Sequence, residues 1–205
     1  MATTDDGLVR CDWAIGKPGS ADFELYRDYH DKEWGQPLHG QVPLFERMSL
    51  EAFQSGLSWL IILRKRENFR RAFAGFDPAK VARFTDADVA RLMADEGIVR
   101  NRAKIVATIA NARVLADGSD DLSELLWSFA PARRCRSQRP KALADVPATT
   151  PESTAMAREL KRRGFRFVGP TTAYALMQAT GMVDDHLRAC WVPSTGDDAA
   201  RRAVR

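Results

Sequence analysis

Hydrophobic residues recur at helical spacing through most of this chain, and polar residues fill the positions between them. An apolar-periodic stretch begins at Pro43 and continues through Leu50, and the segment 55–58 should interrupt it. Ser58 is a suitable N-cap for a second helix that extends to Phe73. The chain shows neither the alternation typical of strands nor a repeat of solenoid length, so its predicted class is all-α.

Turn and cap residues divide the rest of the chain. Further helices are expected to begin at or beside the following positions: Asp77, Thr85, Asn101, Leu122 and Thr150. The Pro- and Arg-rich segment 131–149 has weak periodicity and is interpreted as a loop. The tail after Trp191 matches no motif, and we expect it to be a mobile end.

Composition places the chain among ordinary globular proteins. Its 205 residues are 45% hydrophobic, which is enough for one helical domain over 1–205 or for two closely joined lobes. No apolar run is long enough to cross a bilayer, the N-terminus lacks a signal-peptide core, and three cysteines do not make a disulfide framework. We therefore expect a cytoplasmic protein with no membrane partner. The net charge of +4 is compatible with a nucleic-acid partner without demonstrating one.

Candidate metal ligands lie at opposite ends of the sequence. His186 and Cys190 are four residues apart, and on a helix this spacing would point both side chains toward one tetrahedral ion. Cys11 and His30 offer two further ligands near the N-terminus. A closed site of this kind is structural and would tie the two chain ends together around one Zn²⁺ ion. Alternatively, the four residues coincide by chance and Cys190 is a small buried apolar residue.

A second candidate site is the turn between two predicted helices. One helix should end at Gly164, and Pro170 stands where the first turn of the next helix favours proline. Around Gly169, Thr171 and Thr172, backbone amides would lack intrahelical partners and could bind an anion such as a phosphate. Gly169 would also let a phosphate approach without interference from a Cβ atom. An ordinary helix–helix turn explains the same residues equally well.

The hairpin and a set of short motifs together resemble the constitutive bacterial family of 3-methyladenine DNA glycosylase I, which belongs to the helix-hairpin-helix DNA glycosylases. The resemblance extends from about residue 10 to about residue 191. It rests on these segments: Arg10-Cys11-Asp12-Trp13, Tyr29-His30-Asp31-Lys32-Glu33-Trp34-Gly35, Gly56-Leu57-Ser58-Trp59, Arg64-Lys65-Arg66-Glu67-Asn68, Gly97-Ile98-Val99-Arg100-Asn101-Arg102-Ala103-Lys104-Ile105, Trp127-Ser128-Phe129 and Asp185-His186-x3-Cys190.

The resemblance implies a DNA glycosylase-like helical fold with a helix-hairpin-helix at about 152–180. It also implies a Cys/His/His/Cys zinc site that ties segments 10–34 and 184–191 together. The implied activity is the removal of 3-methyladenine from alkylated double-stranded DNA, with the free base as product. Such an enzyme of base-excision repair would work in the bacterial cytoplasm with the nucleoid, and nothing in the sequence demands more than a monomer.

Glu51 is the candidate for base recognition and catalysis. It shares one helical face with Leu44, Met48 and Ser55, so a carboxylate interrupts an otherwise apolar stripe. Burial of this group without a partner would be costly. A glutamate at the edge of the stripe that reaches water or an arginine is the alternative. The base-binding glutamate of the resembled family matches Glu51.

Aromatic residues gather near the ligand motifs. Trp13, Tyr29, Trp34 and Trp59 are the candidates for a base pocket, although aromatic residues more often belong to a core. A base that leaves the stack can be read between flat walls, and a methylated, cationic base gains from an electron-rich ring face. In the resembled family the base lies between the counterparts of Tyr29 and Trp59, with that of Trp13 nearby.

Two positions bear on the reaction. The wider superfamily places a catalytic Asp shortly before a helix, and this chain reads Val183-Asp184-Asp185-His186, where we associate the narrower family with Asn. Asp184 is therefore either a carboxylate at the sugar or the N-cap of a helix that carries His186. Thr171 stands where strand-cutting members carry a Schiff-base lysine, so a monofunctional glycosylase without lyase activity is expected.

Other interpretations remain at this point. Leu57 is either an apolar wedge that fills the gap left by a flipped base or a core residue. A zinc-stapled DNA-binding module that recognises damage without catalysis is one rival function, and it has no use for Glu51 among aromatic residues. A zinc hydrolase is another, and four protein ligands without a bound water would exclude it.

Overall fold

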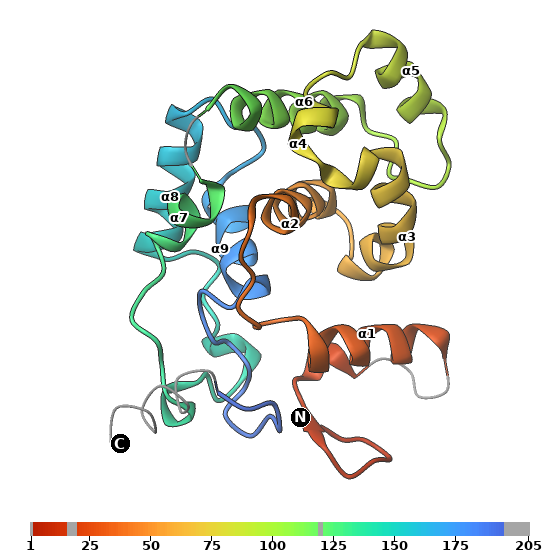
Figure 1. Ribbon diagram of the computed structural model, residues 1–205. Helices are drawn as coiled ribbons and strands as arrows, with labels where there is room; N and C mark the ends of the chain where they lie inside the picture. The colour runs from red at the N-terminus through yellow and green to blue at the C-terminus, as the bar shows by residue number, and fades with distance from the viewer. Residues whose placement is uncertain (1, 16–19, 119–120, 195–205) are drawn as a thin grey trace. The chain divides into compact units, whose positions relative to one another are not determined.

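The computed structural model describes residues 2–15, 20–118 and 121–194 (Figure 1). Among these residues the secondary structure is helical except for two short antiparallel strands, β1 (Ala2–Thr3) and β2 (Val9–Arg10). The all-α prediction is confirmed, and the two strands are too short to produce a visible alternation in the sequence. No helix in these ranges is long and apolar enough to cross a membrane. Almost all of the tail that we expected to be mobile lies outside the described residues.

The chain forms two compact units. The first unit comprises residues 1–37, 130–148 and 177–205, and the second comprises residues 38–129 and 149–176. Each unit therefore contains segments that are far apart in the sequence.

Eight of the described helices belong wholly or mainly to the second unit: α2 (Gln41–Gln54), α3 (Trp59–Ala72), α4 (Pro78–Val81), α5 (Asp86–Ala94), α6 (Arg102–Asp117), α7 (Leu122–Trp127), α8 (Pro151–Arg162) and α9 (Pro170–Ala179). A 3₁₀ turn, η2 (Ala74–Phe76), follows α3. The predicted starts are confirmed, since Asp77, Asn101 and Thr150 are N-caps whose side chains accept backbone N–H groups of the first turn.

A cluster of phenylalanine rings packs α2 against α3 and the turn that follows it. Phe53 of α2 lies 4.7 Å from Phe69 of α3, measured between ring centroids, and Phe73 lies 5.4 Å from Phe76. Phe45 of α2 also contacts Phe76, and all five rings are fully buried. Aromatic pairs of this kind contribute roughly 0.5–1.5 kcal/mol each beyond the area that they bury. The cluster therefore fixes α2, the helix that carries Glu51.

The first unit has less regular structure. Besides β1 and β2, its described elements are η1 (Asp12–Ala14), α1 (Ala21–Lys32), two 3₁₀ turns, η3 (Arg136–Gln138) and η4 (Leu143–Asp145), and the end of α9. The loop prediction for 131–149 is confirmed, because it contains only the two short turns. Helix α1 was not predicted. Polar residues dominate it, so its apolar stripe is weak, and the Ser20 side chain, which accepts the Phe23 N–H at 3.2 Å, is its clearest local signal.

Candidate metal centre and base-recognition site

The four predicted metal ligands meet in the first unit. Cys11, His30, His186 and Cys190 are all buried, and their ligand atoms lie within 4.8 Å of one another. The Cys190 Sγ is 3.5 Å from His30 Nε2 and 3.6 Å from His186 Nδ1, and the Cys11 Sγ is 3.8 Å from His186 Nδ1. A tetrahedral ion with metal–sulfur and metal–nitrogen bonds of about 2.3 and 2.1 Å separates sulfur from nitrogen by about 3.6 Å. The cluster could therefore hold a tetrahedral metal ion.

Both histidine rings are oriented by their second nitrogen. His30 Nδ1 lies 2.7 Å from an Asp31 carboxylate oxygen, and His186 Nε2 lies 3.1 Å from the Trp34 carbonyl oxygen. These acceptors favour a proton on those nitrogens and leave His30 Nε2 and His186 Nδ1 as ligand atoms. The Asp31 carboxylate is itself held by Arg10 at 2.7 Å. The ligands thus have the supporting contacts that metal-bound histidines require.

The two thiols share their charge unequally. A hydrogen bond from Cys11 lowers the pKa of Cys190, and His186 and His30 also favour its thiolate, whereas burial opposes it. The hydrogen bond to Cys190 raises the pKa of Cys11, with burial as a further cause. The Leu187 N–H donates to the Cys11 Sγ at 3.2 Å. A bound cation favours both thiolates, so this donor set suits a soft or borderline metal ion.

The predicted helix under His186 and Cys190 is wrong. Helix α9 ends at Ala179, and residues 181–194 form turns, bends and irregular backbone. Here arginine side chains bind backbone carbonyls that a helix would have used internally. Arg139 donates to the carbonyls of Val192 at 2.8 Å and Pro193 at 3.0 Å. The ligands therefore converge on backbone that is not helical and that Arg139 binds at its end.

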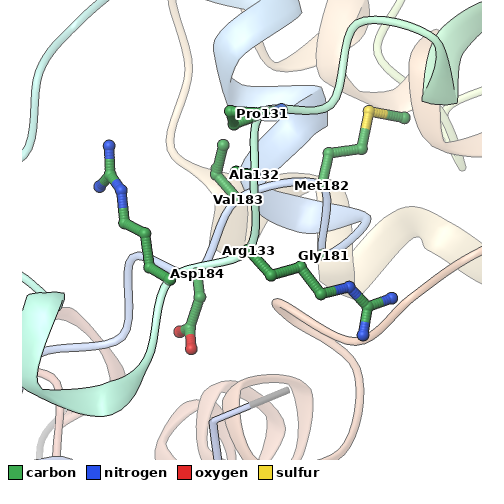
Figure 2. A pocket seen from close by; sticks show the side chains of 8 residues that line it. Pro131, Ala132, Arg133, Gly181, Met182, Val183 and Asp184 are labelled. Atoms are coloured by element: carbon green, nitrogen blue, oxygen red, sulfur yellow. The ribbon is translucent and has the colours of Figure 1, made fainter. Parts of the chain in front are cut away.

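Asp184 is a partner of Arg139. Its Oδ2 accepts from Arg139 Nε and from Ser194 Oγ, each at 2.9 Å. No helix follows it, so the N-cap interpretation is wrong. Residues 131–134 and 181–184 line a pocket of about 10 Å³. Figure 2 shows the side chain of Asp184 among them. A pocket of this volume is far too small for a purine base.

Three of the four candidate pocket aromatics lie together in the first unit. The Trp13 ring centroid lies 5.0 Å from Trp34 and 6.2 Å from Tyr29. Trp34 also packs edge-on against His186 at 4.7 Å, and Trp13 packs against His30 at 5.2 Å. The metal ligands therefore support these aromatic rings directly.

Glu51 and Trp59 belong to the second unit. Glu51 is only 5% exposed, and burial raises its pKa from 4.5 to about 7, while Arg47 opposes that rise. The Arg47 guanidinium lies 5.4 Å from the centroid of the Trp59 ring. Sequence reasoning missed Arg47, although it precedes Glu51 by four residues and so shares its helical face. A buried carboxylate with a raised pKa is a functional-site candidate.

The hairpin between α8 and α9 has a regular helix end. The Phe165 N–H donates to the Leu160 carbonyl and the Gly164 N–H to the Lys161 carbonyl, each at 3.0 Å, in a Schellman pattern with Gly164 at φ 95°. A Cβ atom built at Gly169 would meet no atom of the described protein within 4 Å. Thr171 is exposed and Thr172 partly exposed. Packing against the described residues therefore does not explain the glycine.

Leu57 lies in the turn between α2 and α3. Its side chain is 39% exposed, and Gly56 before it has φ 84°. The interpretation of Leu57 as a core residue is therefore wrong, and the wedge interpretation stays a prediction.

This fold and its buried cluster of cysteines and histidines match one class of protein. The family model described as methyladenine glycosylase matches residues 20–193, and the chain belongs to that family. A DNA-3-methyladenine glycosylase of Haemophilus influenzae is 42% identical over 185 residues, which cover 89% of this chain and 96% of that protein. DNA-3-methyladenine glycosylase 1 of Escherichia coli is 43% identical over 186 residues, which cover 89% of this chain and 96% of that protein.

Solved structures agree with this assignment. A crystal structure of 3-methyladenine DNA glycosylase I superposes with a TM-score of 0.82 at 42% identity. The alignment covers 90% of this chain and 100% of that one. The enzyme of Staphylococcus aureus, solved to explain 3-methyladenine recognition, gives a TM-score of 0.79 at 33% identity, and covers 89% of this chain and 95% of that one. The resemblance seen in the sequence is confirmed, and the protein is a glycosylase.

Proposed function

We propose that the protein removes 3-methyladenine from alkylated double-stranded DNA by hydrolysing its N-glycosidic bond. The observation that carries the proposal is Glu51, a buried carboxylate in a chain of the methyladenine glycosylase family. Glu51 and Trp59 of the second unit would read the flipped base. Tyr29, Trp13 and Trp34 of the first unit stay candidates for contact with it. Burial makes the carboxylate attractive to a group that carries positive charge or donates hydrogen bonds.

The methylated base makes the chemistry undemanding. Methylation at N3 gives the adenine in DNA a positive charge, so the electron pair of the broken bond to the sugar neutralises the leaving base. Water supplies the oxygen that replaces the base on the sugar carbon and loses one proton to solvent. The protein's contribution is to select the base and to tolerate positive charge on the sugar, a task for which a carboxylate is suited. Glu51 is the proposed carboxylate.

Asp184 is the other candidate carboxylate for catalysis. Its bonds to Arg139 and Ser194 occupy the Oδ2 atom and favour a role in fixing the chain around the metal centre.

Thr171, in the place of a Schiff-base lysine, supports a glycosylase without lyase activity. The amides around Gly169, Thr171 and Thr172 would bind the DNA backbone as part of a helix-hairpin-helix, and Leu57 would fill the gap left by the base.

The metal in this proposal is one structural Zn²⁺ ion. Two thiolates and two imidazoles form a complete tetrahedral set, so every position on the ion would be taken by protein. Its task would be to hold Cys11 and the residues around His186 together, and so to support Trp13 and Trp34. We further propose that the protein works as a monomer in the bacterial cytoplasm, with the nucleoid.

Base release from DNA treated with a methylating agent tests the proposal, with the freed bases separated and identified. We expect 3-methyladenine with little 7-methylguanine and no strand cleavage. Release of no base by folded, zinc-loaded protein would contradict the proposal and would favour recognition of damage without excision.

A further inference from the structure

Two of the motifs in the sequence take no part in the metal centre or in base recognition. They are the segments 64–68 on α3 and 97–105 at the start of α6, and they meet in the structure. The Asn68 amide donates to the Gly97 carbonyl at 3.2 Å, and the Gly97 N–H donates to Asp95 at 2.7 Å. A Cβ atom at Gly97 would lie 2.9 Å from the Asn68 amide nitrogen, so a side chain there would displace the Asn68 amide. The connection into α6 is thereby fixed against α3.

This connection leads to Lys104, a buried lysine. The Asn101 side chain caps α6 by accepting the Lys104 N–H at 3.2 Å. The Lys104 side chain is 7% exposed, and its Nζ donates to the carbonyls of Phe53 at 2.8 Å and Ser55 at 2.6 Å. Burial lowers the pKa of Lys104, which measures the cost of placing a charge there. Two charge-assisted hydrogen bonds offset that cost.

The two carbonyls belong to the end of α2 and the turn that follows it. The last carbonyls of a helix lack intrahelical partners, and the negative end of its dipole favours a cation. The same turn is closed by the Leu57 N–H, which donates to the Gln54 carbonyl at 2.6 Å. The buried ammonium group of Lys104 thus binds the turn that exposes Leu57 to solvent.

We propose that Lys104 is a positioning residue that holds the turn 55–58 in the shape with which Leu57 enters the DNA. The inference rests on the proposed function, because it gives this turn a task in base flipping. Glu51 lies in the body of α2, which the ring contacts of the phenylalanine cluster pack against α3 and η2. Loss of Lys104 should therefore impair the step on duplex DNA and spare the affinity for the free base.

The substitution Lys104→Met keeps the length of the side chain and removes the donor. Arg91→Met is the matched control. Arg91 donates to the Ala72 carbonyl, the last of α3, at 3.3 Å, and the substitution removes the same charge. Three quantities are measured: hydrogen exchange of the amides in 55–58, affinity for free 3-methyladenine, and single-turnover base release from methylated duplex. In Lys104→Met we expect exchange roughly tenfold faster or more and release slower by a similar factor, with unchanged base affinity. Arg91→Met should match wild type in all three.

Unchanged exchange in Lys104→Met would overturn the inference, and so would equal losses in base affinity and release. If wild type releases no base, the proposed function fails, but the exchange measurement still decides whether Lys104 holds the turn. If Lys104→Met does not fold, Lys104→Gln replaces it, because glutamine keeps a neutral donor. A smaller rise in exchange is then expected, and no rise would refute the role of Lys104.

Discussion

Replacement of Glu51 by glutamine should stabilise the protein at alkaline pH. Burial raises the pKa of Glu51 from 4.5 to about 7, so between these values the unfolded chain has lost a proton that the folded protein keeps. Wild-type stability therefore falls as pH rises through this window. Proton linkage at Glu51 thus lowers the free energy of unfolding by about 3 kcal/mol at pH 8 and by about 1.4 kcal/mol at pH 5.5. Glutamine has the same shape and no charge, so Glu51→Gln should recover most of this cost.

The assay is urea denaturation of metal-loaded wild type and Glu51→Gln at pH 5.5 and pH 8. The difference between the two proteins cancels every other titrating group. We expect the variant's advantage to be larger at pH 8 than at pH 5.5 by about 2 kcal/mol. Glu46→Gln is the control, because Glu46 of the same helix pairs with Arg70 at 2.8 Å and should show no such gain. An equal advantage at both pH values, or a less stable variant at pH 8, would refute the reasoning.

Three further outcomes follow from the site. Affinity for 3-methyladenine should fall as pH drops below about 7, because Glu51 then takes up a proton; titration calorimetry across this range checks it, and a flat profile would contradict it. Cys190→Ser should lose the bound metal and unfold at lower urea, as metal analysis and denaturation would reveal; full metal content would disprove the site. Asp184→Asn removes the charge partner of buried Arg139, so unfolding should cost about 3 kcal/mol less. Its base-release rate should be unchanged, and a large loss would make Asp184 catalytic.

The helices of the second unit could be predicted because their signals are local. Asp77, Asn101 and Thr150 are side chains that cap the helix directly following them, so sequence and structure coincide at those ends. The first unit offers fewer such signals. Helix α1 is polar, and the chain from 181 to 194 is shaped by Arg139, which is remote in sequence.

The same distinction applies to the site. The ligand set Cys11, His30, His186 and Cys190 could be predicted from residue type, and the four residues do meet. Their local backbone could not, because a cluster of this kind depends on tertiary contacts. Arg47 was within reach of helical spacing. Lys104 was not, since nothing in the sequence indicates that its ammonium group reaches carbonyls about fifty residues earlier.

Direct binding of free 3-methyladenine to wild type, Glu51→Gln and Glu46→Gln at pH 8 tests most directly the claim that Glu51 reads the base. Wild type and Glu46→Gln should bind the base with equal affinity, and Glu51→Gln should lose at least tenfold in affinity, the loss expected for one charge-assisted hydrogen bond of about 1.5–3 kcal/mol. Equal affinity of all three proteins would contradict the central assignment, because the base would then be recognised without Glu51.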